Sequence, residues 1–399
     1  MQILLISRCL PYPLHYGDRL ILYHVVRELQ ALGHDFDLLA FYLQDSGLQE
    51  IPRVAHMFDR VETIREQPRS PLNYLQRLTK IFPDGADECW NPDMWKMIEK
   101  ISTQKKFDLV HFFGGIQVYE FRNLVRDLPK IIVPYDSHAL YMKRAIDHTN
   151  HWDDRIRLQA VSAITHQYEQ NIYEGFDRTV LVSERDQEYL HGIAPDLNSV
   201  VIPNGVDAEY FKPITSSHDS SLVFIGNYDY RPNVDAAVML ITDVFPLVKQ
   251  VIPDVSVKII GPNAPEQLTS LANKYVEITG FVSDVRPYLS KAACCAAPIF
   301  LGSGIRNKML EAMAMKVPVV TTPIGCEGIA VTQGKNILLG QDCNEIAQAV
   351  IRLLCDETLR TEVTNGGYEL VHQKYTWAFA GKKYDALYNE VFAAHQCRI

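Results

Sequence analysis

Short apolar segments alternate with helix-patterned segments along this chain, and this alternation limits the folds open to it. In the first half the clearest apolar segments lie at residues 3–7, 36–42, 109–113 and 131–135. In the second half they lie at residues 222–225, 255–260, 276–279, 293–299 and 317–322. Nearly continuous apolar strands that alternate with helices are typical of parallel, doubly wound sheets. The pattern therefore predicts an α/β protein with two Rossmann-like lobes.

The length and one polar stretch predict where the domains divide. A chain of 399 residues is long enough for two domains of about 200 residues each. A turn at Pro203-Asn204-Gly205 and a polar stretch at 215–221 lie between apolar strands, so we place the hinge there. We expect an N-terminal domain at 1–205 and a C-terminal domain at 206–377. Apolar residues at helical spacing predict a last helix, at about 378–399, that packs back on the first domain.

Composition excludes several classes of protein. A formal net charge of -9 argues against nucleic-acid binding, although a small basic site for a phosphate ligand remains compatible with it. The eight cysteines show no CxxC pair and no metal-ligand spacing, so we expect them reduced and mostly buried. The chain shows no basic leader and no apolar run long enough to span a bilayer. We therefore expect a soluble, cytoplasmic protein, with at most peripheral contact with the inner membrane.

An amphipathic pattern at residues 71–82 leaves two interpretations open. Leu72, Leu75, Leu78 and Ile81 share one face of the predicted helix. Such a face can lie on lipid or on an acceptor substrate, or it can pack into the core. Core packing is the preferred interpretation, because it is the commoner role of such a face.

The segment at residues 298–314 carries the clearest chemical signal. An apolar strand ends there in a glycine turn, and a helix is predicted to begin near Ile305. Free backbone N–H groups at a helix start that follows a parallel strand form an anion site. Cations are unfavourable beside the positive end of a helix, so Arg306 and Lys308 indicate a bound anion. Glu311, one to two turns further on, can accept hydrogen bonds from a ribose.

This segment resembles the donor-binding motif of a known family. Residues 304–314 (GIRNKMLEAMA), followed by Val317-Pro318-Val319-Val320, resemble that motif in retaining GT-B glycosyltransferases of family 4. Further elements of the family recur in the same order at residues 203–207, 224–226, 279–282 and 375–377, together with Ile259-Ile260-Gly261. The first half matches more loosely, through Pro11-Tyr12-Pro13, Gly17 and Ser183-Glu184.

The resemblance implies a fold, a reaction and a set of substrates. The fold is GT-B, with two facing Rossmann-like domains and a cleft between them. The reaction is transfer of a sugar, with retention at the anomeric carbon, in polysaccharide or glycoconjugate biosynthesis. The donor is a nucleotide-diphosphate sugar on the second domain, and the acceptor is a glycan, a lipid-linked or another small molecule. The resemblance places these residues at the donor: Gly17, Gly226, Arg231, Phe281, Val282, Ser303, Gly304, Arg306, Lys308 and Glu311.

Two features depart from the family pattern. The family motif E-x7-E would place its first Glu at position 303, where this chain has Ser303, and its second at Glu311. The family often has an Arg and a Lys after the first glycine turn of the second domain, where Asn227 and Pro232 stand here. The diphosphate is then expected to contact the other nearby cations: Arg231, Arg306 and Lys308.

The catalytic candidates lie in the first half. An apolar strand at 131–135 leads to Asp136 and His138, and the family commonly has a His or Asp there beside the reacting sugar. His138 is expected to donate a hydrogen bond to the donor sugar, with Asp136 fixing its tautomer or contacting the acceptor. An ordinary surface histidine is the alternative. Gly17 would let backbone approach a ligand closely, or it is a simple turn glycine.

We expect neither a metal nor a further cofactor. The one obvious Asp-x-Asp, Asp35-Phe36-Asp37, begins a strand, whereas ligands gather at the carboxyl ends of such strands. An NAD-dependent oxidoreductase is disfavoured, because no G-x-G-x-x-G follows the first strand. Two alternatives stay open: a nucleotide-sugar epimerase of the same fold, and a catalytically silent carbohydrate-binding protein, which Ser303 would favour.

Overall fold

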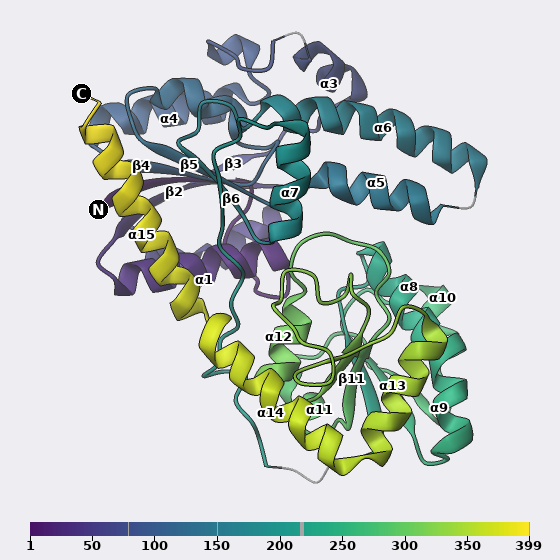
Figure 1. Cartoon of the computed structure of the whole chain (residues 1–399). Helices are drawn as coiled ribbons and strands as arrows, with labels where there is room; N and C mark the ends of the chain where they lie inside the picture. Colours follow the sequence, from purple (N-terminus) through teal and green to yellow (C-terminus); the bar gives the residue numbers. More distant parts are fainter. Residues whose placement is uncertain (79, 150, 216–218, 399) are drawn as a thin grey trace. The chain divides into compact units, whose positions relative to one another are not determined.

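The computed structural model describes residues 1–78, 80–149, 151–215 and 219–398. The chain forms two compact units, each with its own sheet and core (Figure 1). Unit 1 comprises Met1–Pro203 and Trp377–Ile399, and unit 2 comprises Asn204–Thr376. The chain crosses between the units twice. The two connections run side by side, because the backbone N–H of Val206 donates to the carbonyl oxygen of Tyr375 at 2.8 Å.

In the described residues, unit 1 has a seven-stranded parallel sheet in the order β3-β2-β1-β4-β5-β6-β7. Its strands are β1 (Gln2–Ser7), β2 (Asp35–Tyr42), β3 (Arg60–Arg65), β4 (Leu109–Phe113), β5 (Lys130–Tyr135), β6 (Arg178–Leu181) and β7 (Ser199–Val201). Ile3 of β1 pairs with Phe36 of β2 on one side and with Leu109 of β4 on the other. Chain order therefore reverses between β1 and β4, and such sheets bind ligands outside the carboxyl ends of the strands at that point.

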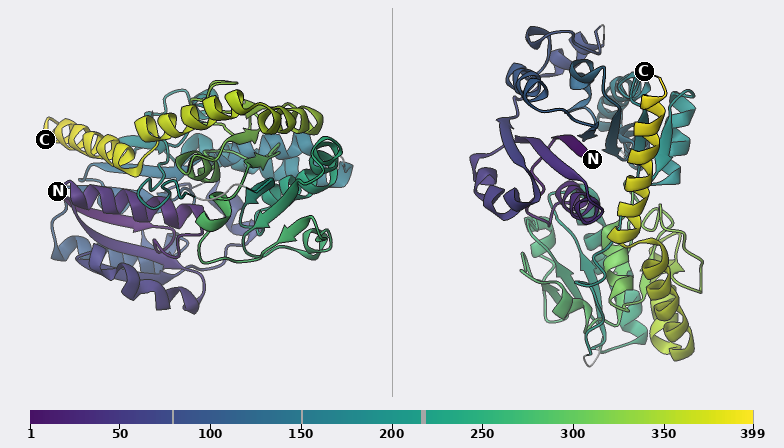
Figure 2. Two further views of the ribbon diagram at one scale, coloured as in Figure 1. Left: turned by 90° about the horizontal axis from the view of Figure 1, so that it is seen from below. Right: turned by 90° about the vertical axis from the view of Figure 1, so that its left-hand side faces the viewer.

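Helices cover both faces of this sheet (Figures 1 and 2). They are α1 (Gly17–Ala31), α2 (Ile51–Val54), α3 (Pro71–Arg77), α4 (Pro92–Gln104), α5 (His138–His148), α6 (Trp152–Asn171), α7 (Glu184–Ile193) and α15 (Trp377–Gln396). Leu5 belongs to the core on the side of α1 and α15, and Leu4 to the core on the side of α4. Both faces are thus buried, which explains why β1 is almost wholly apolar.

The last helix, α15, packs along α1 (Figures 1 and 2). Its Tyr388 hydroxyl lies 2.6 Å from Nδ1 of the buried His111. Its Asp385 carboxylate lies 2.8 Å from Nε2 of His34. Its first residue, Trp377, stacks on the ring of His24 with centroids 5.0 Å apart. The C-terminal segment therefore belongs to the core of unit 1.

In the described residues, unit 2 has a six-stranded parallel sheet in the order β10-β9-β8-β11-β12-β13. Its strands are β8 (Ser221–Ile225), β9 (Ser256–Ile260), β10 (Val276–Ile278), β11 (Cys294–Ala297), β12 (Val319–Thr321) and β13 (Leu338–Leu339). Its helices are α8 (Arg231–Met239), α9 (Phe245–Val251), α10 (Glu266–Thr269), α11 (Arg286–Leu289), α12 (Asn307–Ala314), α13 (Cys343–Cys355) and α14 (Glu357–Lys374). Chain order reverses between β8 and β11, so the switch point of this unit lies there.

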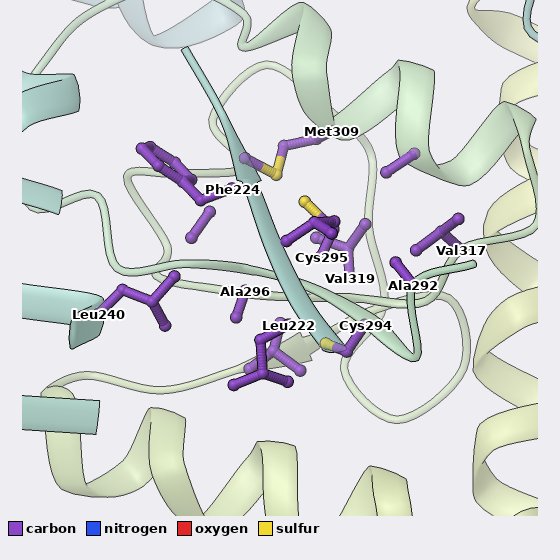
Figure 3. Close-up of a cluster of buried hydrophobic side chains, with 14 of the residues drawn as sticks. Leu222, Phe224, Leu240, Ala292, Cys294, Cys295, Ala296, Met309, Val317 and Val319 are labelled. Atoms are coloured by element: carbon purple, nitrogen blue, oxygen red, sulfur yellow. The ribbon is translucent and has the colours of Figure 1, made fainter. Parts of the chain in front are cut away.

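The core of unit 2 fixes α12 against the sheet. Figure 3 shows Met309 of α12 among side chains of β8 and β11, with Phe224 and Cys295 beside it. These three side chains are almost completely buried. The cysteines of the chain form no disulfide, and five of the eight are buried, as expected. In the part of the chain described, no helix is long and apolar enough to cross a bilayer.

The segment at 71–82 corrects one expectation. The helix α3 ends at Arg77, and Leu72 and Leu75 are 61% and 49% exposed, so core packing is wrong for these two leucines. The buried side chain here is Arg77, which donates to the carboxylate of Glu120 at 3.2 Å. The buried carboxylate of Glu120 needs a charged partner. The face of α3 that points inward therefore carries Arg77, and Leu72 and Leu75 face outward.

Candidate active site

Two glycine turns, one after β8 and one after β9, lie next to the switch point of unit 2. Gly226 follows β8 and donates its N–H to the carbonyl oxygen of Ile260 at 3.0 Å. Gly261 follows β9 with φ +138°, and a Cβ atom there would collide with the carbonyl oxygen of Gly226. A Cβ on Gly226 would approach the side chain of Asn233 to 3.1 Å. Backbone thus packs on backbone at the end of β8, as the glycine pattern predicts.

The loop after β11 delivers the start of α12 to the same end of the sheet. Gly302 and Gly304 have φ angles of +143° and +69°, which L side chains rarely adopt. The helix begins at Asn307, two residues later than expected, because Arg306 still has extended backbone angles. In the described residues no side chain caps this helix start. The N–H of Met309 donates to the carbonyl oxygen of Arg306 at 2.9 Å, and the N–H groups at the very start of the helix are left to water or to a ligand.

Arg306 is a buried cation with spare hydrogen-bonding capacity. Its side chain folds back, and Nη1 donates to the carbonyl oxygens of Ser303 and Gly304. The residue is only 9% exposed, and within the described structure its Nη2 is buried without a hydrogen-bond partner. A buried charged donor without a partner is costly, so this nitrogen suits an anionic ligand.

Lys308 and Glu311 face the same site from α12. Nζ of Lys308 donates to Oδ1 of Asn233 at 2.6 Å and lies 4.4 Å from the ring centroid of Phe224. Burial, helped by the charge of Arg306, lowers the pKa of Lys308 to about 7. Burial raises the pKa of Glu311 to about 7, and Lys308 opposes this rise. Among the described residues, the half-buried Glu311 makes no hydrogen bond through its side chain.

The other predicted donor residues lie further out. Arg231 begins α8 and forms an ion pair with Asp235 at 2.8 Å, with its side chain 66% exposed. Phe281 and Val282 follow β10, two strands from the switch point. Phe281 is 63% exposed, whereas Val282 packs partly against the core of unit 2. The structure therefore gathers Gly226 and the residues of the β11–α12 loop, and it places Arg231 in a surface ion pair.

In unit 1 the predicted catalytic residues lie in the turn between β5 and α5. Tyr135, the last residue of β5, has φ +79°, an uncommon conformation for a bulky residue. Asp136 is half-buried, and His138 is the first residue of α5 with an exposed side chain. Ser137 between them caps the helix, because its Oγ accepts from the N–H of Leu140 at 3.1 Å. This turn lies at the carboxyl end of β5, the edge where the ligands of parallel sheets bind.

Two buried carboxylates that the sequence interpretation missed hold this turn. Glu169 of α6 accepts from Oγ of Ser137 at 2.6 Å, from the N–H of His138 at 2.7 Å and from the N–H of Ala139 at 3.2 Å. Asp186 of α7 accepts from the N–H of Ser137 at 2.9 Å. The backbone N–H groups of three successive residues, Ser137, His138 and Ala139, therefore donate to carboxylates.

The switch point of unit 1 contains an arginine that we did not predict. Arg8 follows β1, pairs with Asp18 at 3.2 Å and lies over the ring of Tyr135 at 5.6 Å. A Cβ atom on Gly114, after β4, would touch its side chain. Gly17 begins α1 with open space around its Cα, so packing does not require a glycine there.

The Asp-x-Asp lies at the amino end of β2. Asp37 is buried and pairs with Lys105 at 2.5 Å, and Asp35 accepts from the side chain of Gln2 at 2.8 Å. Both carboxylates are thus engaged in contacts within the sheet edge. In the part of the chain described, no cluster of three or more His, Cys, Asp or Glu side chains could hold a metal ion.

Comparison with known proteins identifies the family. The model of glycosyltransferase family 4 matches residues 20–210, and the model of glycosyl transferases group 1 matches residues 219–356. An uncharacterized 44.6 kDa protein in the cps region of Klebsiella pneumoniae is 21% identical, over 94% of this chain and 96% of that protein. The phosphatidyl-myo-inositol mannosyltransferase of Mycobacterium leprae is 27% identical, over 49% of this chain and 54% of that protein.

Solved structures share the fold. HepE of Anabaena, whose structure was determined in complex with UDP and glucose, superimposes with a TM-score of 0.66. The superposition covers 97% of this chain and 99% of that protein, at 15% sequence identity. The family models matched by the two halves of the sequence and the fold of the two sheets therefore agree on one group of proteins. This chain belongs to the GT-B glycosyltransferases of the group 1 and family 4 type.

Proposed function

We propose that this chain is a retaining glycosyltransferase that takes a sugar from a nucleotide-diphosphate sugar on unit 2 and transfers it to an acceptor on unit 1. One observation carries the proposal: Nη2 of Arg306 is buried without a partner beside an uncapped helix start. Lys308, whose charge is destabilised by burial, is the second residue of that helix. A diphosphate would supply the negative charge that these groups lack.

Glu311 is proposed to bind the ribose of the donor. Its carboxylate is half-buried and makes no hydrogen bond among the described residues, so it is available to two neighbouring hydroxyl groups. The close backbone packing of Gly226 on Gly261 leaves that end of the sheet free of large side chains. The UDP found with HepE supports a nucleotide diphosphate as the ligand class.

The reaction is proposed to need no divalent metal. Negative charge grows on the diphosphate as the sugar departs, and positioned cations can stabilise it as a metal ion does. Arg306, Lys308 and the N–H groups at the start of α12 would provide that charge. His138 would donate a hydrogen bond to the reacting sugar, and Asp136 would orient its ring or contact the acceptor.

The acceptor is proposed to be a glycan, a lipid-linked or another small molecule of polysaccharide or glycoconjugate biosynthesis. Two relatives support this class: one is encoded in a cps region, and the other is named for mannosyl transfer to phosphatidyl-myo-inositol. A lipid-linked acceptor would bring the protein to a membrane surface, and such contact would be peripheral.

The first test is a thermal-shift panel of nucleotides and nucleotide sugars. A ligand that binds only the folded state raises its stability, so the matching nucleotide diphosphate should raise the unfolding temperature. Transfer to acceptors is then assayed with the best donor, and NMR of the product reports the anomeric configuration. An inverted product would refute retention. Conversion of the donor without an acceptor would indicate an epimerase, and binding without turnover would indicate a silent binding protein.

A further inference from the structure

We propose that Glu169 is a positioning residue for sugar transfer, which holds the turn that carries Asp136 and His138 in its reactive geometry. The inference rests on the proposed function, in which His138 contacts the reacting sugar. Glu169 itself does not touch a substrate in this proposal. It acts by fixing the backbone from which the side chain of His138 projects.

The geometry of Glu169 supports this role. Its Oε1 accepts from the N–H of His138 at 2.7 Å, and its Oε2 accepts from the N–H of Ala139 at 3.2 Å. Oε2 also accepts from Oγ of Ser137 at 2.6 Å. Both oxygens therefore bind the first residues of α5, where the positive end of the helix favours a negative charge. Glu169 is 4% exposed, so water has little access to these bonds.

The strand side of the turn is held by other groups, so Glu169 is the residue that fixes the start of α5. Tyr135 holds a left-handed backbone conformation, and its carbonyl oxygen accepts from the N–H of Val182 at 3.2 Å. Asp186 holds the N–H of Ser137 and also accepts from Oγ of Ser183. A strained conformation persists only where its surroundings determine it. Loss of the Glu169 contacts would free the start of α5 and shift His138.

The charge of Glu169 is sensitive to pH near neutrality. Burial, with a smaller contribution from the charge of Asp136, raises its pKa to about 7 although its three hydrogen-bond donors lower it. Tyr173 and Tyr189 also lie close to Glu169, and both stay neutral because burial raises their pKa. On the turn itself, burial lowers the pKa of His138 while the charge of Asp136 opposes this, and Asp186 binds the N–H of Ser137. A protonated carboxyl loses charge and an acceptor site. The ionised form, above pH 7, is therefore the one that holds the turn.

The test compares the wild type with Glu169→Gln and with a matched control, Asp154→Asn. Asp154 is an exposed carboxylate in the first turn of the same helix, α6. The Gln side chain keeps the shape but loses the charge and presents N–H₂ to groups that are themselves donors. Three quantities are measured on the full chain: kcat and KM for donor and acceptor from about pH 5.5 to 8.5, amide hydrogen exchange at residues 137–140, and the thermal unfolding midpoint.

A positioning role predicts a specific set of changes. In Glu169→Gln, kcat should fall about tenfold to a hundredfold, because small displacements of a reacting group have effects of this size. Donor KM should stay within about twofold, and exchange at residues 138 and 139 should become faster. The rise of kcat through pH 7 that ionised Glu169 produces in the wild type should disappear. Asp154→Asn should match the wild type in every measurement.

Two outcomes would overturn the proposal in different ways. A wild type that binds a nucleotide diphosphate but transfers no sugar overturns the proposed function, whereas the exchange result still reports on the turn. A wild type that transfers sugar while Glu169→Gln keeps its kcat and pH profile overturns the positioning role alone. Should Glu169→Gln not fold, Glu169→Asp keeps the charge but is one methylene shorter. In that variant a lower kcat with the pH dependence retained supports the role, and an unchanged kcat refutes it.

Discussion

The starts of α5 and α12 are built alike and completed differently. Each helix follows a parallel strand and a residue with positive φ, Tyr135 in unit 1 and Gly304 in unit 2. At α5 the chain supplies its own anion, because Glu169 and the hydroxyl of Ser137 occupy the helix start. At α12 no described side chain caps the helix, its first turn contains no acidic residue, and Arg306 and Lys308 stand at its start.

This difference suits the start of α5 to a supporting role and the start of α12 to ligand binding. A helix start that is filled by a buried carboxylate is satisfied and fixed, so it can hold a neighbouring side chain in place. A helix start beside a buried guanidinium with one unpartnered nitrogen, Nη2 of Arg306, has donors to spare for an anion. In the proposed function, the same element would place His138 in unit 1 and receive a diphosphate in unit 2. The following predictions test this division.

Removing both cations of α12 should have the largest effect. In Arg306→Ala with Lys308→Ala, transfer loses two charge-assisted interactions worth together about 3–6 kcal/mol, or roughly 100-fold to 10,000-fold in kcat/KM. The control is Lys316→Gln, which removes an exposed positive charge just beyond the other end of α12. Steady-state kinetics measures both variants. A double variant that retains more than about a tenth of the wild-type kcat/KM would show that α12 is not the diphosphate site.

His138→Ala should lower turnover by about tenfold to a hundredfold and leave nucleotide affinity nearly unchanged, because the lost hydrogen bond forms with the reacting sugar. His148→Ala removes an exposed histidine at the other end of α5 and serves as the control. Asp136→Asn, alone and with His138→Ala, tests whether the two residues act as a unit, in which case their effects are not additive. A wild-type kcat at saturating donor and acceptor would remove His138 from the site.

Glu311→Ala should weaken donor binding about tenfold or more, since a hydrogen bond to a charged group contributes about 1.5–3 kcal/mol. Isothermal titration calorimetry with the nucleotide diphosphate measures the change. Glu362→Ala, an exposed carboxylate on α14, is the control. Unchanged affinity in a folded Glu311→Ala protein would mean that Glu311 does not contact the ribose.

Nucleotide binding should take up a proton above neutral pH, the smallest of these effects. Burial, helped by the charge of Arg306, lowers the pKa of Lys308 to about 7, so Lys308 is largely neutral in the free site at about pH 8. A bound diphosphate favours the charged form, so binding should take up as much as about one proton, and affinity should fall as pH rises above 7. Calorimetry in buffers of different ionisation enthalpy counts the proton. Persistence of the uptake in Lys308→Met would assign it to another group.

The sheets and the α12 loop could be predicted from the sequence because their signals are local. A strand buried on both faces must be apolar throughout, and Ile3 to Ile6 are all fully buried. Glycines at the ends of β8 and β11 mark positions where backbone packs on backbone or takes positive φ. Arg306 and Lys308 follow such a turn directly, so their position at a helix start could be read from the order of residues.

The contacts that complete each site could not be predicted, because they depend on how segments far apart in the sequence pack together in the fold. Glu169 lies 31 residues after His138 and reaches it only because α6 runs back along α5 (Figure 1). Asn233 meets Lys308 from another helix in the same way. Arg231 looked like a third cation, but Asp235 stands one helical turn away and pairs with it. The contacts of Glu169 and Asn233 follow from the tertiary fold and leave no periodic signal, whereas Arg231 and Asp235 lie four residues apart on one helix, a spacing that the sequence shows.

The rate of sugar transfer in EDTA shows whether the chain itself stabilises the departing diphosphate. With saturating donor and acceptor, the wild-type rate in EDTA should stay within about twofold of the rate in Mg²⁺, because Arg306, Lys308 and the open start of α12 provide the positive charge. The Arg306→Ala, Lys308→Ala protein should show the same large loss of transfer, about 100-fold or more, in both conditions. Loss of wild-type activity in EDTA that Mg²⁺ or Mn²⁺ restores would contradict the account.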